Sequence, residues 1–153
     1  MLYTSLIIPH FDYCNVVWGN AGNTLLSKLD VLQKTAGKVI LGLPRRFPTD
    51  VLFSRLGWEK LCDRRLTHLN ILVYKSLSCN VPSNLCNIFT TLSNSHSYST
   101  RACCQGNLVL PPCRNTSDTR KFTYRGASAF NNLPAAAKSP LPVKLAIFKR
   151  IIT

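Results

Sequence analysis

The sequence predicts a mainly α-helical protein, a bundle of about five or six helices followed by a loop-rich, weakly β C-terminal segment and a terminal helix. Residues 57–78 contain no proline and no internal glycine, and their apolar side chains recur at helical spacing. Residues 24–42 follow the same pattern. The chain has 153 residues, 46% of them hydrophobic, which suits one folded core rather than disorder.

The predicted organisation has three parts: a helical domain over residues 1–89, a linker or mobile loop over 90–119, and a small segment over 120–153. Serine, threonine, asparagine and cysteine dominate the middle part, and apolar periodicity is lost there. Beyond it, residues 121–124 alternate as in a strand, and residues 126–132 indicate a short helix. The last helix is expected to begin at residues 139–140, where its apolar side chains recur at intervals of three and four.

The helix over residues 24–42 is predicted to bury an arc that includes Leu32 and Val39, with Lys34 and Lys38 on the opposite, solvated side. Gly42 ends this helix. Arg45 and Arg46 then form a basic turn. Residues 48–56 indicate a shorter helix that ends at Gly57, and residues 84–89 two further helical turns.

In a helical projection of residues 57–78, the neighbouring residues Arg64 and Arg65 fall on different sides of the helix. Arg64 falls on the polar edge, beside Lys75, and is predicted to bind a ligand. Arg65 falls on the apolar arc, so it needs an acidic partner, for which Asp12 is the candidate. That arc also holds Cys62 and Leu66. Arg65, Asp12, Trp18 and Trp58 are therefore predicted to be structural.

The charge balance is the strongest functional signal. There are 19 Lys and Arg side chains against 6 Asp and Glu, a net charge of +13. Residues 91–153 carry nine basic side chains and one acidic, a net charge of +8. A chain this basic is expected to contact a polyanion, either nucleic acid or an acidic membrane surface. No stretch approaches the ~18 apolar residues that span a bilayer, so no membrane partner is predicted.

No catalytic residue or cofactor is predicted. The six carboxylates are scattered, without the paired spacing of a two-metal site. Nucleotide-binding glycine motifs and a G-x-S-x-G motif are both missing. The seven cysteines show no C-x-x-C spacing, and a reducing intracellular setting is expected. His96, Cys103, Cys104 and Cys113 are the only zinc candidates in a loop-like segment, but no histidine follows Cys113. No metal is predicted, and a small cysteine-rich metal-binding module stays as an alternative.

Binding is the remaining chemistry. The predicted contacts to a phosphate backbone combine cations of the helical part with those of the last third, where bases and aromatics intersperse as in single-strand binders. The alternative is an ordinary solvated surface. The predicted binding residues are Lys34, Lys38, Arg45, Arg46, Arg64, Lys75, Arg120, Lys121 and Arg125.

Four ordered blocks resemble a known family: residues 2–20 (LYTSLIIPHFDYCNVVWGN), 28–46 (KLDVLQKTAGKVILGLPRR), 56–77 (LGWEKLCDRRLTHLNILVYKSL) and 120–134 (RKFTYRGASAFNNLP). They are similar to the region after the reverse transcriptase domain in LINE-type, jockey-like non-LTR retrotransposon proteins. In that family the first blocks belong to a helical thumb beside the template and primer, and the later ones to a C-terminal segment.

The resemblance implies a fragment of a reverse transcriptase rather than an active enzyme. The fingers and palm are missing, and with them the family's metal-binding aspartates. The expected partners are RNA or an RNA–DNA hybrid and the missing palm and fingers. The expected location is a nuclear or cytoplasmic ribonucleoprotein. The alternative is a non-functional relic or scaffold of a decayed element.

Overall fold

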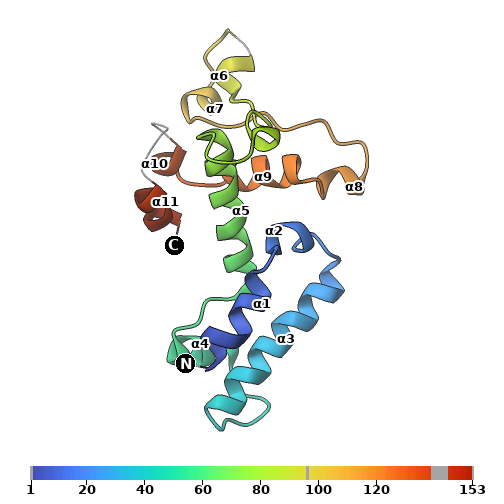
Figure 1. The fold of residues 1–153 in the computed structure, drawn as a ribbon, viewed down its shortest axis with the longest axis vertical. Coiled ribbons are helices and arrows are strands. Elements are labelled where there is room, and N and C mark those ends of the chain that lie inside the picture. The colour runs from blue at the N-terminus through green and yellow to red at the C-terminus, as the bar shows by residue number, and fades with distance from the viewer. Residues whose placement is uncertain (1, 96, 139–144, 153) are drawn as a thin grey trace. The chain divides into compact units, whose positions relative to one another are not determined.

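The computed structural model describes residues 2–95, 97–138 and 145–152. Within them the protein is mainly helical, as the sequence predicts (Figure 1). The described residues form eleven α-helices rather than five or six, because short turns divide the expected segments. They include no β-strand, and one isolated antiparallel bridge joins Thr91 to Leu108.

The chain divides into two compact units, Met1–Leu66 and Thr67–Thr153. This division differs from the predicted boundaries after residues 89 and 119. The physical reason is Leu108, which lies in the expected linker but is only 2% exposed and packs in the core of the second unit. Residues 90–119 therefore contribute to a core, so the loop-like composition of this segment is a poor guide to its packing.

Unit 1 contains α3 (Asn23–Ile40) and α4 (Thr49–Leu56), close to the predicted ranges. The long helix α5 (Leu61–Leu77) begins four residues later than predicted and contributes to both units. Its first N–H, at Leu61, donates to Gln33 Oε1 at 3.3 Å, and Gln33 Nε2 donates to the carbonyl of Glu59 at 2.9 Å. The remaining elements of unit 1 are a π-helix (Tyr3–Ile7), α1 (Ile8–Asp12) and α2 (Asn15–Trp18).

The buried face of α3 is not the apolar face that the sequence predicts. Gln33 and Gly37 are buried. A Cβ atom on Gly37 would lie 3.0 Å from Leu56 Cδ1 and 3.2 Å from Leu52 Cδ2. The predicted core residues Leu32 and Val39 are instead 58% and 75% exposed. Glycine lets α4 approach closely on this face, which is why the helix turns its more polar side inward.

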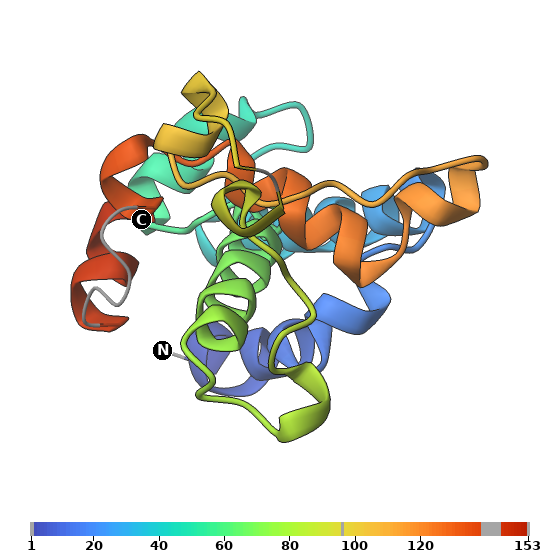
Figure 2. The same ribbon diagram turned by 90° about the horizontal axis from the view of Figure 1, so that it is seen from above.

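Unit 2 is built around the C-terminal half of α5, with α9 (Phe122–Asn131) beside it (Figures 1 and 2). The Tyr74 and Phe148 rings stack with centroids 4.4 Å apart, and Gly126 packs against Val73 and Phe89. The core residues are Val73, Tyr74, Phe89, Leu108, Ala127, Phe130, Ala137 and Phe148. The other helices of unit 2 are η2 (Ser83–Leu85), α6 (Leu92–Ser95), α7 (Arg101–Cys104), α8 (Thr116–Thr119), α10 (Ala135–Lys138) and α11 (Leu145–Ile152).

Several local predictions for these segments are wrong. Residues 121–124 are not strand-like, because Phe122 begins α9. Only a single 3₁₀ turn forms within the segment expected to give two turns over 84–89. Cys62 is exposed and Leu66 is 49% exposed, although both lie on the predicted apolar arc of α5. The terminal helix does form, as α11, and the start predicted for it at 139–140 lies outside the described residues.

In the part of the chain that the structure describes, no helix has both the length and the apolar character needed to cross a bilayer.

Candidate nucleic-acid interface

Positive charge is divided unequally between the two units. Residues 1–66 carry nine Lys and Arg side chains and five Asp and Glu, a net charge of +4. Residues 67–153 carry ten Lys and Arg side chains and a single acid, Asp118, a net charge of +9. The acids of unit 1 can neutralise many of its cations, whereas unit 2 has one carboxylate for ten.

Arg64 is engaged in an ion pair within unit 1. Its Nε and Nη2 atoms each lie 2.6 Å from a carboxylate oxygen of Asp12, a bidentate geometry. Its Nη1 lies 3.8 Å from Glu59 Oε2. The hydrogen bonds to Asp12 raise the pKa of Arg64 above its ordinary value. The predicted ion pair between Asp12 and Arg65 is therefore wrong, because Asp12 pairs with Arg64 instead.

Arg65 is nevertheless the more buried of the two arginines. Its side chain is 11% exposed, and its Nη1 lies 3.9 Å from Asp30 Oδ1. A Cβ atom on Gly19 would come within 3.2 Å of Arg65 Cδ. A buried guanidinium beside a carboxylate fits the structural role predicted for Arg65, with Asp30 in place of Asp12.

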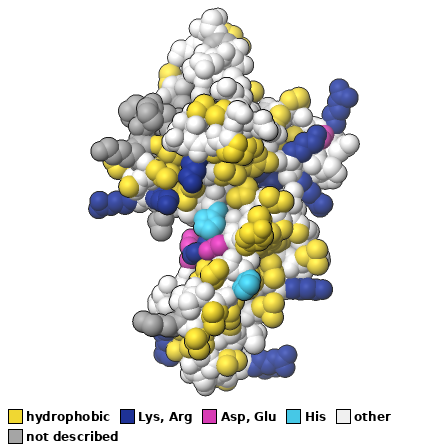
Figure 3. Space-filling model, viewed as in Figure 1, with side chains coloured by type: hydrophobic (Ala, Val, Ile, Leu, Met, Phe, Trp, Pro, Cys, Tyr) yellow, Lys and Arg dark blue, Asp and Glu magenta, His cyan; other side chains and the backbone are white. Residues whose placement is uncertain are grey.

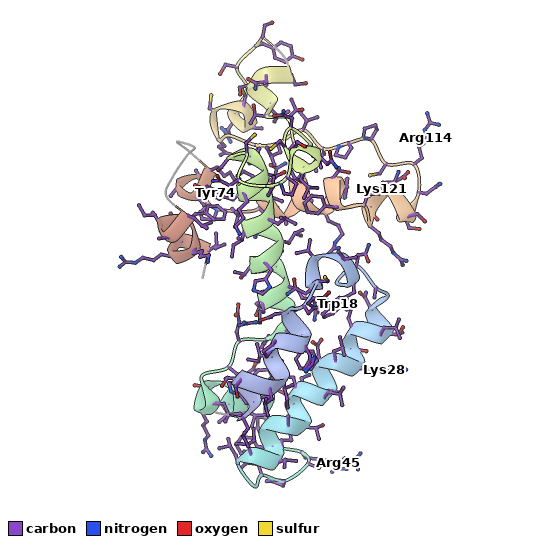
Figure 4. The ribbon with its side chains drawn as sticks, in the orientation of Figure 1. Trp18, Lys28, Arg45, Tyr74, Arg114 and Lys121 are labelled. Atoms are coloured by element: carbon purple, nitrogen blue, oxygen red, sulfur yellow. The ribbon has the colours of Figure 1, made fainter. Side chains whose placement is uncertain are left out.

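The two basic residues of α3 that were predicted to bind nucleic acid are less exposed than predicted. Lys38 is half-buried, and its Nζ donates to the carbonyl of Arg45 at 2.5 Å. Lys34 is half-buried too, and lines a pocket of about 260 Å³ with Asp30 and Asp50. Arg45 and Arg46 are exposed in the turn after α3. Lys28, which the sequence did not single out, is also exposed on α3 (Figure 4).

The two tryptophans make packing contacts in unit 1. Trp58 stacks on Tyr3, with ring centroids 3.7 Å apart and an interplanar angle of 18°. Burial raises the pKa of Tyr3. The Trp18 indole N–H donates to the carbonyl of Tyr13 at 2.7 Å. Trp18 therefore fixes a local turn, and Trp58 packs on Tyr3 of the π-helix.

In unit 2, three basic residues flank α8, the short helix that contains Asp118. Arg114 precedes this helix, and Arg120 and Lys121 follow it; the three are called the basic turn below. The Asp118 Oδ2 atom accepts the backbone N–H groups of Arg114 at 3.1 Å and Asn115 at 3.3 Å. Its Oδ1 atom lies 2.8 Å from Lys121 Nζ. The Lys121 ammonium and these N–H groups hold the pKa of Asp118 below its ordinary value. Asp118, which sequence reasoning did not assign, thus holds two basic residues on one turn.

Figures 3 and 4 show basic side chains gathered at the α8 end of unit 2. Arg114 and Arg120 are exposed, and 67% of the Lys121 side chain is exposed. Arg125 and Lys75 are half-buried. The structure thus brings Arg114, Arg120 and Lys121 together at the basic turn, but not Lys75.

Among the described residues, no three His, Cys, Asp or Glu side chains lie close enough together to hold a metal ion. His96 lies outside the described residues. Cys103, Cys104 and Cys113 are free thiols.

Comparisons of the chain with family models, with curated proteins and with solved structures find no match.

Proposed function

We propose that this chain binds nucleic acid through its basic surface, as the thumb and post-thumb part of a LINE-type reverse transcriptase that has no polymerase activity by itself. The observation that carries the proposal is the charge of unit 2, ten cations against one acid. A phosphate backbone releases counterions when such cations approach it, so the binding free energy grows with the number of contacts. The four sequence blocks described above supply the proposed parentage.

The proposed contacts differ from those predicted by sequence alone. Arg64 and Lys38 are half-buried, so they present less surface to a phosphate group than exposed cations do. The exposed cations are better placed. They include Lys28, Arg45 and Arg46 in unit 1 and Arg114, Arg120 and Lys121 in unit 2, although Lys121 also pairs with Asp118.

The test is the affinity of the chain for a labelled RNA–DNA hybrid, measured at several salt concentrations. We expect the affinity to fall steeply with salt, with a slope of about 0.7–0.9 per phosphate contact on a log–log plot. Replacing Arg114, Arg120 and Lys121 together by glutamine should weaken binding and flatten the slope. Affinity that does not change with salt, or that is equal in the triple variant, would contradict the proposal.

One observation favours a second candidate, a scaffold that needs another protein domain. The faces of the π-helix and α3 form an open groove of about 450 Å³ lined by Leu2, Ile7, Leu32, Val39 and Ile40 among others. Large exposed apolar surfaces of this kind mark interaction sites or aggregation. The resemblance makes the polymerase palm the expected partner. Self-association of the isolated chain that disappears on co-expression with a palm domain would support this candidate.

A further inference from the structure

Unit 2 contains a small apolar slot near the basic turn. It has a volume of about 250 Å³ and is lined by Ile88, Phe89, Thr90, Val109, Pro111 and Thr123. Pockets for drug-sized ligands hold about 300–1,000 Å³, so this slot suits a single flat ring system rather than a larger molecule. Threonine hydroxyls in its wall add groups that can donate or accept hydrogen bonds.

The walls of the slot are held by a set of bonds within unit 2. Val109 N–H donates to the carbonyl of Thr90 at 2.8 Å. The side-chain amide of Asn131 accepts from the backbone N–H of Leu108 at 2.7 Å and donates to its carbonyl at 3.0 Å. The Phe89 ring meets Phe122 edge to face, with centroids 5.4 Å apart. Because these groups are fixed before a ligand arrives, binding would cost little ordering.

Cations that are close in sequence to the slot wall indicate the class of ligand. Thr123, in the slot wall, follows Lys121 by two residues and Arg120 by three, at the start of α9. Asp118 joins Arg114 to the same turn through its backbone N–H. Cations beside an apolar slot complement a molecule with a flat apolar ring and an anionic chain. Single-stranded nucleic acid has both, because its unpaired bases project from a phosphate backbone.

We propose that this slot accepts one unpaired base of single-stranded RNA while the adjoining phosphates contact Arg114, Arg120 and Lys121. The inference rests on the proposed nucleic-acid binding and adds to it a site for a base. It implies a preference for single strands over duplexes, because a paired and stacked base cannot enter the slot.

The test compares two labelled RNA strands of equal length and charge, one of which carries abasic positions in its central part. The intact strand should bind at least about fivefold more tightly, as the loss of one base contact predicts. Replacing Thr123 by phenylalanine fills the slot, and it should reduce the affinity for the intact strand to that for the abasic strand. The abasic strand, which keeps its phosphates, should bind the variant and the wild type equally.

The control variant is Thr24→Phe, the same change at an exposed position of unit 1. It should leave the preference for the intact strand unchanged, and circular dichroism should show that both variants fold. Equal, salt-dependent binding of the two strands by the wild type would overturn the slot while leaving the proposed nucleic-acid binding in place. Binding of neither strand would overturn both.

Discussion

Unit 1 and unit 2 differ in what they bury and in what they expose. Among the described residues, thirteen large hydrophobic side chains are exposed in unit 1 and three in unit 2. Unit 1 uses carboxylates to pair its cations, as in the Arg64–Asp12 bridge, whereas unit 2 packs an aromatic core and carries a net charge of +9. The difference indicates that unit 2 buries more of its large hydrophobic side chains than unit 1 does.

The largest expected effect is on the core of unit 2. Phe130 is fully buried there, with its ring centroid 6.5 Å from that of Phe148. Phe130→Ala should destabilise unit 2 by about 3–5 kcal/mol, because it removes apolar contacts and leaves a cavity. Urea unfolding followed by circular dichroism measures the loss. A change below ~1 kcal/mol would mean that unit 2 lacks the packed core described here.

A pair of leucine substitutions tests which face of α3 is buried. Leu52 lies on α4, beside Gly37 on the buried face of α3, and Leu32 lies on the exposed face of α3. Leu52 is fully buried, and Leu52→Ala should cost about 2–5 kcal/mol. Leu32 is 58% exposed, and Leu32→Ala should change the free energy of unfolding by no more than about 0.5 kcal/mol. Thermal unfolding of both variants checks the pair. If Leu32→Ala proved the more damaging, the apolar arc of α3 would be buried after all.

Alanine substitutions at Gly126 of unit 2 and Gly37 of unit 1 compare how tightly the two units are packed around these positions. In Gly126→Ala the new methyl would lie 2.8 Å from atoms of Val73 and Phe89, and such overpacking costs about 1–3 kcal/mol. Gly37→Ala meets only the leucine side-chain ends described above, at 3.0–3.4 Å. Its gain in helix propensity of up to about 1 kcal/mol should offset that crowding. If a denaturant titration showed that both variants lose the same free energy of unfolding, the two positions would not differ in packing as described.

The smallest effect concerns the pH dependence of unit 2. Lys138 is 4% exposed, its Nζ donates to Asn107 Oδ1 at 2.9 Å, and burial lowers its pKa. The folded state then binds this proton less tightly than the unfolded state, so stability should rise with pH between the lowered pKa and the ordinary value of 10.5. Lys138→Met should remove this rise. Melting temperatures across alkaline pH would reveal it, and parallel curves for the two proteins would contradict it.

Sequence patterns predicted the helical class because the periodicity of α3 and α5 is long, and glycine placed the end of α4 correctly. They could not predict which face of α3 is buried, since Gly37 and Gln33 act through contacts with distant residues. The helical projection placed Arg64 and Arg65 on different sides of α5, but it could not identify the carboxylate that each one contacts. An ion pair depends on which remote carboxylate the fold brings close. Leu108 was missed in the same way, since a core position in a polar loop has no periodic signal.

In the candidate interface, sequence reasoning predicted Arg120 and Lys121 as binding residues but did not predict the turn that brings them together with Arg114. The turn depends on Asp118, the one acid of unit 2. An asparagine followed three residues later by an acid, as at Asn115 and Asp118, is a helix-start signal that could have revealed it.

The proposed function expects nucleic acid to contact the basic turn of unit 2 more strongly than Lys28, Arg45 and Arg46 of unit 1. The most direct measurement compares two triple glutamine variants of equal charge, one at Arg114, Arg120 and Lys121 and one at Lys28, Arg45 and Arg46. Each is titrated with single-stranded RNA over a range of salt. The unit 2 variant should lose about 2 from the log–log salt slope, at about 0.7 per contact, and the unit 1 variant less. An unchanged slope in the unit 2 variant would contradict the claim.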